Sequence, residues 1–173
     1  MDKVAMPRVS KEILTSLVEE DVTHLLDACN SARDKAIVLV LLDTGLRASE
    51  LVNLDGKDID LDLGEIHVRR GKGGKDRTVF LGSEARRALR NYYTERGEPL
   101  EDQPVWISQT RHQRLTASGL HQLLKRLGEH AGVDDCAPHT MRRTFALWCL
   151  RNGMDVFRLA RLMGHADITV LRR

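Results

Sequence analysis

Seven consecutive apolar residues, 36–42, end a segment with helical periodicity that begins near Ser31. A helix that is apolar on nearly every side has to be surrounded by other protein, so this segment is predicted to lie at the centre of the core. Gly45 follows it closely and can adopt the left-handed backbone conformation that ends helices. Seven apolar residues are far fewer than the roughly 18 that a membrane span requires. Because the segment is apolar on nearly every side, the remaining elements are expected to pack around a helix over residues 31–42.

The rest of the chain is predicted to be mainly helical with one small antiparallel β-sheet, an α+β fold. Ile66 and Val68 alternate with polar residues over 65–69, and Val79 and Leu81 alternate with Thr78 and Phe80 over 78–81. These two runs lie on either side of the glycine-rich residues 71–76, which predicts a β-hairpin. Residues 105–108 are predicted as a short strand. Helical patterns, the third of them with Ser83 as its N-cap, are predicted at residues 21–28, 48–54, 83–96, 116–131, 140–152 and 156–163. No linker-like or repeated segment divides the 173 residues, so a single domain is expected.

The cysteines point to a reducing compartment. Cys29, Cys136 and Cys149 are odd in number and lack C-x-x-C spacing, which argues against a disulfide scaffold or a structural zinc site. The first residues lack the apolar stretch of a secretory signal. We therefore expect a cytoplasmic protein.

The charges are divided unevenly along the chain. The net charge is only +2, yet residues 1–66 carry a net charge of −7 and residues 67–173 one of +9. Clustered cations gain affinity for a polyanion because they release counterions condensed on its phosphates. The alternative is a set of solvated helix faces. On charge alone, both interpretations stay open.

Five cationic side chains stand at structurally distinctive places: Arg47 after the helix stop, Lys72 between glycines of the hairpin, His139 and Arg142 one turn apart after Pro138, and His165 after Gly164. Taken singly, each has an ordinary structural explanation, such as an ion pair or a solvated turn. The hairpin glycines do not form a nucleotide-binding P-loop, and no two histidines have the H-x-x-x-H spacing of a helical metal site. No metal or other cofactor is predicted.

Four blocks occur in one order: residues 44–51 (TGLRASEL), Gly71-Lys72-Gly73, residues 138–146 (PHTMRRTFA) and residues 162–165 (LMGH). In this combination the sequence resembles the catalytic domain of the tyrosine recombinases, the phage-integrase and Xer-like family, over roughly residues 10–173. Two departures are mild: Met141 stands where leucine is more usual, and Arg143 where histidine often follows.

The resemblance implies site-specific DNA recombination or integration by transesterification, without metal or nucleotide, through a 3′-phosphotyrosyl intermediate. It implies that Arg47 and Arg142 hold the non-bridging phosphate oxygens, a role suited to planar guanidiniums that make paired hydrogen bonds. It further implies Lys72 as the general acid, His139 as the base that helps the tyrosine, and His165 as a phosphate ligand. Support for Arg47 is expected from Glu50 and Asp43.

The resemblance places the attacking tyrosine nine residues after His165, at position 174, one residue beyond Arg173. Tyr92 and Tyr93 lie elsewhere in the order and are not candidates. Residues 1–173 are thus expected to form the catalytic domain alone, without the N-terminal core-binding domain and the C-terminal tyrosine segment, and to be unable to cleave DNA by themselves.

The implied partner is double-stranded DNA. The complete recombinase is expected to be tetrameric on DNA, and this chain monomeric or weakly associating, with no membrane partner. Further DNA contacts are predicted at Lys75, Arg77, Arg111, Arg114, Lys125, Arg126 and Arg143.

Three alternatives stay open at this point. The first is a non-catalytic DNA-binding regulator or decoy that retains the pocket. The second is a type IB topoisomerase, which shares the chemistry. The third is a helical scaffold in which the motifs occur by chance.

Overall fold

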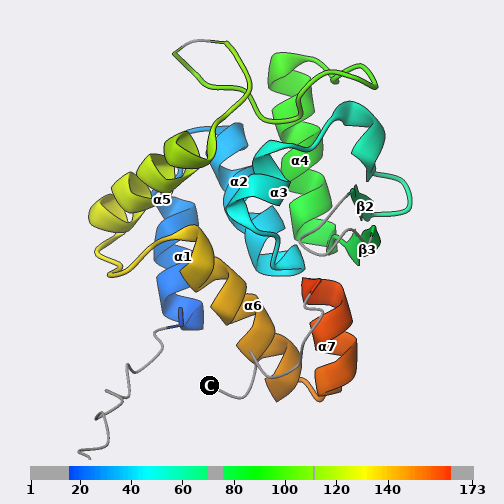
Figure 1. Ribbon diagram of the computed structural model, residues 1–173. Helices are drawn as coiled ribbons and strands as arrows, with labels where there is room; N and C mark the ends of the chain where they lie inside the picture. The colour runs from blue at the N-terminus through cyan, green and yellow to red at the C-terminus, as the bar shows by residue number, and fades with distance from the viewer. Residues whose placement is uncertain (1–15, 70–75, 111, 165–173) are drawn as a thin grey trace, which may run out of the picture.

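The computed structural model describes residues 16–69, 76–110 and 112–164, and it confirms the mainly helical fold with a small antiparallel sheet (Figure 1). Its helices are α1 (Glu19–Asp27), α2 (Ala32–Thr44), α3 (Ala48–Val52), α4 (Ser83–Arg96), α5 (Ala117–Ala131), α6 (Pro138–Arg151) and α7 (Val156–Met163), and a short 3₁₀ turn, η1, spans Gly56–Asp58. The strands are β1 (Ile59–Asp60), β2 (Glu65–Val68) and β3 (Arg77–Phe80). None of the helices in these ranges combines the length and the apolarity that a bilayer span requires.

Helix α2 forms the centre of the core, as its apolar run predicts. It packs against α4 and α6, and Ile37, Val38 and Leu41 are fully buried. The Ser31 hydroxyl accepts a hydrogen bond from the backbone of Asp34 and so caps the first turn. At the other end Gly45 has φ +59°, and a Cβ at this position would lie 2.3 Å from Cδ1 of Phe145 on α6. The glycine therefore both ends α2 and lets α6 approach.

The sheet has the strand order β1-β2-β3 with antiparallel pairing throughout. In the predicted hairpin Ile66 pairs with Val79, and both side chains are buried, while His67 between the buried positions of β2 is exposed. The pattern did not predict β1, because a strand of two residues cannot show an alternation.

Two sequence predictions are wrong in detail. Residues 105–108 form no strand: Val105 donates to Leu54 O, Leu115 donates to Trp106 O, and Ile107 makes only an isolated bridge to Arg114. Val105 and Trp106 are buried in the core, which explains why this segment is apolar although it forms no strand pairing. Ser83 is not the N-cap of α4, because that position belongs to Gly82.

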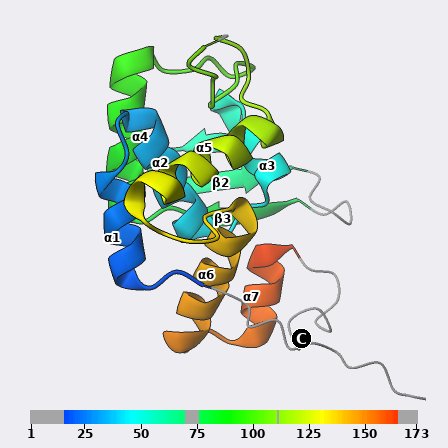
Figure 2. The same cartoon turned by 90° about the vertical axis from the view of Figure 1, so that its left-hand side faces the viewer.

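Helices α6 and α7 share a smaller hydrophobic cluster outside the main core, and the two helices lie side by side (Figure 2). We call it the satellite cluster; it consists of Phe145, Ala146, Leu159 and Met163, with Cys149 and Met154 packed against it. Helix α6 begins at Pro138, two residues earlier than expected, since proline fits the first turn of a helix. The C-terminal end of α7 contacts β3 (Figure 1), which brings a distant part of the sequence to the sheet.

Candidate functional site: an arginine cluster at the end of helix α7

Arg47 and Glu50 form a charged cap at the start of α3. Arg47 is the N-cap residue, placed there by the turn at Gly45 that ends α2. Glu50 Oε2 accepts a hydrogen bond from the Arg47 backbone nitrogen at 2.8 Å, and Glu50 Oε1 accepts one from Arg47 Nη1 at 3.0 Å. The expected support of Arg47 by Glu50 is therefore present in the structure.

Arg142 reaches from α6 to the ends of two other helices. Its Nη1 donates to Gly45 O, after α2, and its Nη2 donates to Met163 O at the end of α7, at 2.6 Å. Burial, and after it the positive charges of Arg47 and Arg77, lower the pKa of Arg142 to about 10, although Glu50 opposes the shift. The guanidinium is still charged at neutral pH, in a partly desolvated place where its hydrogen bonds are stronger than in water.

A third arginine, Arg77 at the start of β3, completes the arrangement. Its Nη1 and Nη2 donate to the two carboxylate oxygens of Glu50, both at 2.8 Å, and its Nε donates to Leu162 O at 2.6 Å. The sequence suggested a DNA contact for Arg77, but the structure directs its guanidinium inward onto Glu50. The sequence offered no signal for this contact, because Arg77 directly precedes the predicted strand over residues 78–81 and nothing in its neighbourhood indicates an ion-pair partner.

The three arginines meet at the last carbonyl groups of α7. Arg77 bonds Leu162 O, Arg142 bonds Met163 O, and Arg47 Nη2 bonds Gly164 O at 3.3 Å. A helix leaves its last carbonyls without internal partners and carries a partial negative charge there, so cations stabilise this end. We call Arg47, Arg77 and Arg142 with Glu50 the arginine cluster. Its formal charge of three cations and one anion suits it to bind a further anion.

Glu50 is charged although its side chain is buried. Burial alone would raise the pKa of its carboxyl group, but the hydrogen bonds from Arg77 and from the Arg47 backbone, with the charges of both arginines, hold the pKa below the ordinary value.

His139 lies on α6, one turn before Arg142. Its side chain is 60% exposed, and its Nε2 lies 3.6 Å from Asp135 Oδ1. Arg143 Nη2 binds the other oxygen of the same carboxylate at 3.1 Å. Asp135 thus holds the two side chains that flank the first turns of α6, a pairing that the sequence analysis did not anticipate.

Asp43 does not support Arg47 as expected. Its Oδ2 accepts a hydrogen bond from the backbone nitrogen of Gly82 at 2.7 Å, so this carboxylate helps to fix the start of α4. Burial raises the pKa of Asp43, and the Gly82 hydrogen bond offsets part of that rise. The predicted site residues Lys72 and His165, and the predicted DNA contacts Lys75 and Arg111, lie outside the described residues.

The other predicted DNA contacts have different surroundings. Arg114 is tied to the protein, with Nη2 at 2.6 Å from Asp55 Oδ1 and Nη1 at 3.1 Å from Val52 O. Lys125 and Arg126 are exposed on α5, where Lys125 Nζ lies 3.9 Å from a Glu129 carboxylate oxygen. Their DNA contacts stay predictions.

Both tyrosines of the sequence are buried in α4 and remote from these roles. Tyr92 donates its hydroxyl hydrogen to Val105 O at 3.2 Å and its ring stacks on Trp106, with 5.5 Å between ring centroids. Burial raises the pKa of Tyr93 strongly. Neither hydroxyl is placed to attack a phosphate.

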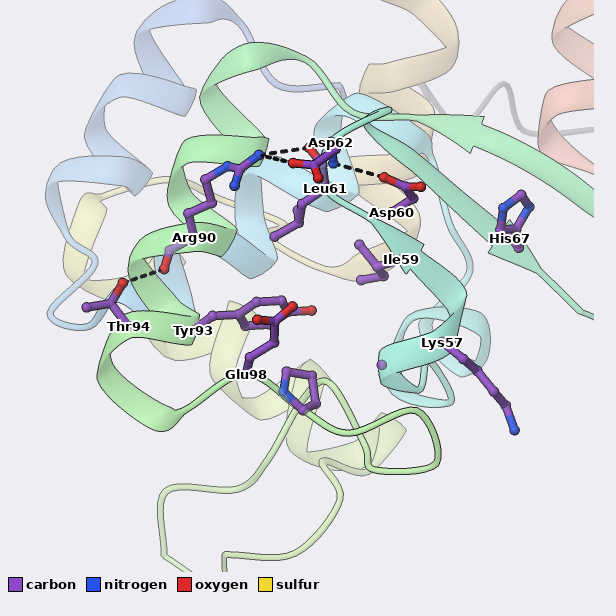
Figure 3. Close-up of a pocket in the computed structure, with 12 residues that line it drawn as sticks. Lys57, Ile59, Asp60, Leu61, Asp62, His67, Arg90, Tyr93, Thr94 and Glu98 are labelled. Carbon is purple, nitrogen blue, oxygen red and sulfur yellow. Dashed lines mark hydrogen bonds and ion pairs between the residues drawn. The ribbon is translucent and has the colours of Figure 1, made fainter.

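A cavity of about 820 Å³ lies elsewhere, between β1 and α4 (Figure 3). Arg90 bridges to Asp62 Oδ1 at 3.0 Å along its upper edge, and Tyr93 and Glu98 lie on the α4 side. It shares no residue with the arginine cluster. In the described ranges no group of three or more histidine, cysteine, aspartate or glutamate side chains is arranged to hold a metal ion.

Known proteins are similar to this chain in both sequence and fold. Residues 15–173 match the family described as the phage integrase family. A tyrosine recombinase XerA of Saccharolobus solfataricus is 39% identical over 163 residues, covering 94% of this chain and 52% of the relative, and a tyrosine recombinase XerC of Corynebacterium glutamicum is 32% identical over 172 residues, covering 96% and 56%. A crystal structure of XerA recombinase superimposes with a TM-score of 0.84 at 34% identity, covering 99% of this chain and 60% of that one.

The chain thus spans about half to three fifths of the length of these relatives. The similarity extends over nearly all of this chain. The chain therefore belongs to the phage integrase family, and its named relatives are tyrosine recombinases of the Xer type.

Proposed function

We propose that residues 1–173 are the catalytic domain of a site-specific tyrosine recombinase, which binds duplex DNA and cuts and rejoins it with a tyrosine supplied from outside these residues. The observation that carries the proposal is the arginine cluster, in which Arg47 and Arg142 are fixed by carbonyls of one helix end. A solved relative, XerH site-specific recombinase bound to its difH substrate, is 25% identical with a TM-score of 0.76 and supports DNA as the partner.

The cluster suits the transition state of phosphoryl transfer. As a tyrosine oxygen attacks phosphorus and the bond to the 5′ oxygen breaks, negative charge increases on the two non-bridging oxygens. Arg47 and Arg142 are already ordered by the protein, so stabilising that charge needs little reorganisation, and loss of one such donor lowers a rate by about 10² to 10³-fold. The departing 5′ oxygen takes a proton, for which Lys72 is the proposed donor, and His139 is the proposed acceptor of the tyrosine proton. Attack by a 5′ hydroxyl on the phosphotyrosine reverses the steps and seals a new strand.

The tyrosine has to come from outside residues 1–173. Tyr92 and Tyr93 are buried, so the 173-residue polypeptide alone is expected to form no covalent adduct with a nicked suicide duplex. Denaturing gel electrophoresis after incubation checks this. An adduct with the unaltered polypeptide would show that another residue attacks.

The catalytic proposal is tested with a polypeptide extended by one tyrosine at position 174, incubated with a pool of nicked duplexes of randomised sequence. Covalent adducts are expected with the extended chain, and none when the added residue is phenylalanine or when Arg47→Lys is introduced. Duplex binding without any adduct would favour the non-catalytic regulator or decoy.

DNA binding by the 173-residue chain is expected to be weak and salt-dependent, because its contacts are mainly with phosphates. In a mobility-shift titration, Arg47→Ala should weaken binding and reduce the slope of log affinity against log salt by about 1. Arg87→Ala, which removes an exposed α4 arginine paired with Glu84, is the control and should change neither quantity. An affinity for DNA that does not change with salt concentration would contradict the proposal.

Without DNA, the 173-residue chain is expected to be monomeric or weakly associating. Light scattering that shows a stable tetramer would contradict this expectation.

A further inference from the structure

We propose that Arg77 is a positioning residue of the phosphate site: by holding both Glu50 and the end of α7, it sets where the Arg47 guanidinium lies. The proposal rests on the proposed function, since it concerns how the same pocket receives a phosphate. Arg77 is assigned no contact with DNA and no part in the chemical step.

The environment of Arg77 confines it to an indirect role. Its side chain is 9% exposed, and all three of its guanidinium nitrogens donate to other parts of the protein. Two of these bonds go to Glu50 and one to Leu162 O. Apart from the effect of its charge, Arg77 can therefore influence a bound phosphate only through the groups that it contacts.

Glu50 is the first route. A carboxylate has about four lone-pair positions, and Glu50 receives four donors: two nitrogens of Arg77, the Nη1 of Arg47 and the backbone nitrogen of Arg47. Without Arg77, two positions would be empty on a buried anion whose remaining guanidinium partner is Arg47. We expect Arg47 to move onto Glu50 and away from its bond with Gly164 O.

The end of α7 is the second route. Gly164 has φ +64°, and a Cβ at this residue would lie 3.0 Å from Arg77 Nη1, so the glycine backbone packs directly against the guanidinium. The carbonyls of Met163 and Gly164 in turn hold Arg142 and Arg47. Arg77 thus fixes the helix end that both phosphate-binding arginines use. Lysine carries the same charge but has one nitrogen, which cannot span Glu50 and Leu162 as the guanidinium does.

Arg33, in the first turn of α2 and at the opposite end of that helix from Gly45, offers a matched control. Its side chain is 8% exposed, its Nε and Nη2 bind Asp34 Oδ1 at 2.9 and 2.7 Å, and its Nη1 binds Ile107 O at 2.9 Å. Arg33→Met and Arg77→Met remove the same charge, a similar buried volume and the same number of bonds. They differ in whether the arginine cluster loses a member.

The experiment follows guanidinium NMR signals of the ¹⁵N-arginine-labelled 173-residue chain during titration with inorganic phosphate, at a temperature where circular dichroism shows every variant to be folded. Arg47→Lys and Arg142→Lys assign the signals. In the unaltered chain the signals of Arg47 and Arg142 should shift with phosphate. Arg77→Met should move the Arg47 signal before phosphate is added and weaken phosphate binding at least fivefold, whereas Arg33→Met should leave binding within twofold.

Arg77→Lys separates positioning from charge. If lysine leaves phosphate binding at least fivefold weaker, positioning is supported; if it restores wild-type binding, Arg77 acts only through its charge and the proposal is overturned. If Arg77→Met does not fold, the lysine variant alone decides whether Arg77 acts by positioning or by charge. Wild-type binding in Arg77→Met, with binding lost in Arg47→Lys, overturns the positioning role and leaves the proposed function standing. If phosphate shifts neither the Arg47 nor the Arg142 signal of the unaltered chain, the proposed function fails and this proposal fails with it.

Discussion

Glu50 connects the electrostatics of the site to the stability of the fold. Its pKa in the folded chain is lower than the ordinary value of 4.5 because Arg77 and Arg47 favour the charged form more than burial disfavours it. A group whose folded pKa is depressed contributes stability above its unfolded pKa, and that contribution is lost as the pH falls through the folded pKa. The carboxylate therefore stabilises the fold fully at neutral pH and progressively less below about pH 4.5.

Glu50→Gln is accordingly expected to lower the free energy of unfolding by about 3 kcal/mol at pH 7, because it leaves buried arginines without their anion. The difference from the unaltered chain should shrink as the pH falls below about 4.5, where the native carboxyl becomes protonated too. Urea titrations at several pH values measure it. A difference that stays constant down to about pH 2.5 would contradict the assignment.

Gly45 shows how one residue serves two elements at once. Gly45→Ala is expected to cost about 3 kcal/mol, from the positive φ and from the contact of the new Cβ with Phe145. Gly132 ends α5 with φ +69° and has no atom within 4 Å of an added Cβ, so Gly132→Ala should cost only about 1 kcal/mol. Thermal unfolding compares the two; equal losses would mean that the close approach of α6 is relieved by small shifts.

At the scale of elements, helix caps give a direct comparison between sequence and structure. Ser31 and Ser83 both precede helical patterns, but only the Ser31 hydroxyl accepts a capping hydrogen bond, while α4 begins after Gly82. Ser31→Ala should therefore destabilise the chain by about 1 kcal/mol and Ser83→Ala by less than about 0.5 kcal/mol. Chemical denaturation measures both losses of stability. A larger loss for Ser83→Ala than for Ser31→Ala would show that Ser83 is a cap after all.

The helices were predictable because their apolar residues recur at helical spacing or, in α2, form a nearly continuous run. The bounds of α7 agree with the sequence prediction residue for residue, and the prediction for α2 differs from the observed helix by no more than two residues. The strand β1 was not predictable, since two residues show no period. The role of Arg77 was not predictable either, because its partners Glu50 and Leu162 are 27 and 85 residues away in the sequence and meet it only in the folded chain.

At the scale of the molecule, the core is divided into two unequal parts. The main core surrounds α2, whereas among the described residues the satellite cluster contains four buried side chains between α6 and α7. Small clusters open more readily than large ones, because less buried apolar surface holds them together.

Hydrogen exchange should show this division. Amides of α7 are expected to exchange through a local opening whose free energy changes little at low urea concentrations. Amides of α2 are expected to exchange only through global unfolding, whose free energy falls steeply with urea. Arg77→Met should speed exchange in α7 without speeding it in α1. Equal protection and equal urea dependence in α2 and α7 would show that the two clusters open together.

The positions of the two tryptophans give this division an optical consequence. Trp106 is fully buried and stacked on Tyr92 in the main core, whereas Trp148 is half-buried beside Phe145 and Cys149, next to the satellite cluster. Their emission spectra should differ, blue-shifted for the first and red-shifted for the second. Intrinsic fluorescence therefore reports separately on the main core and on the satellite cluster, with no label attached.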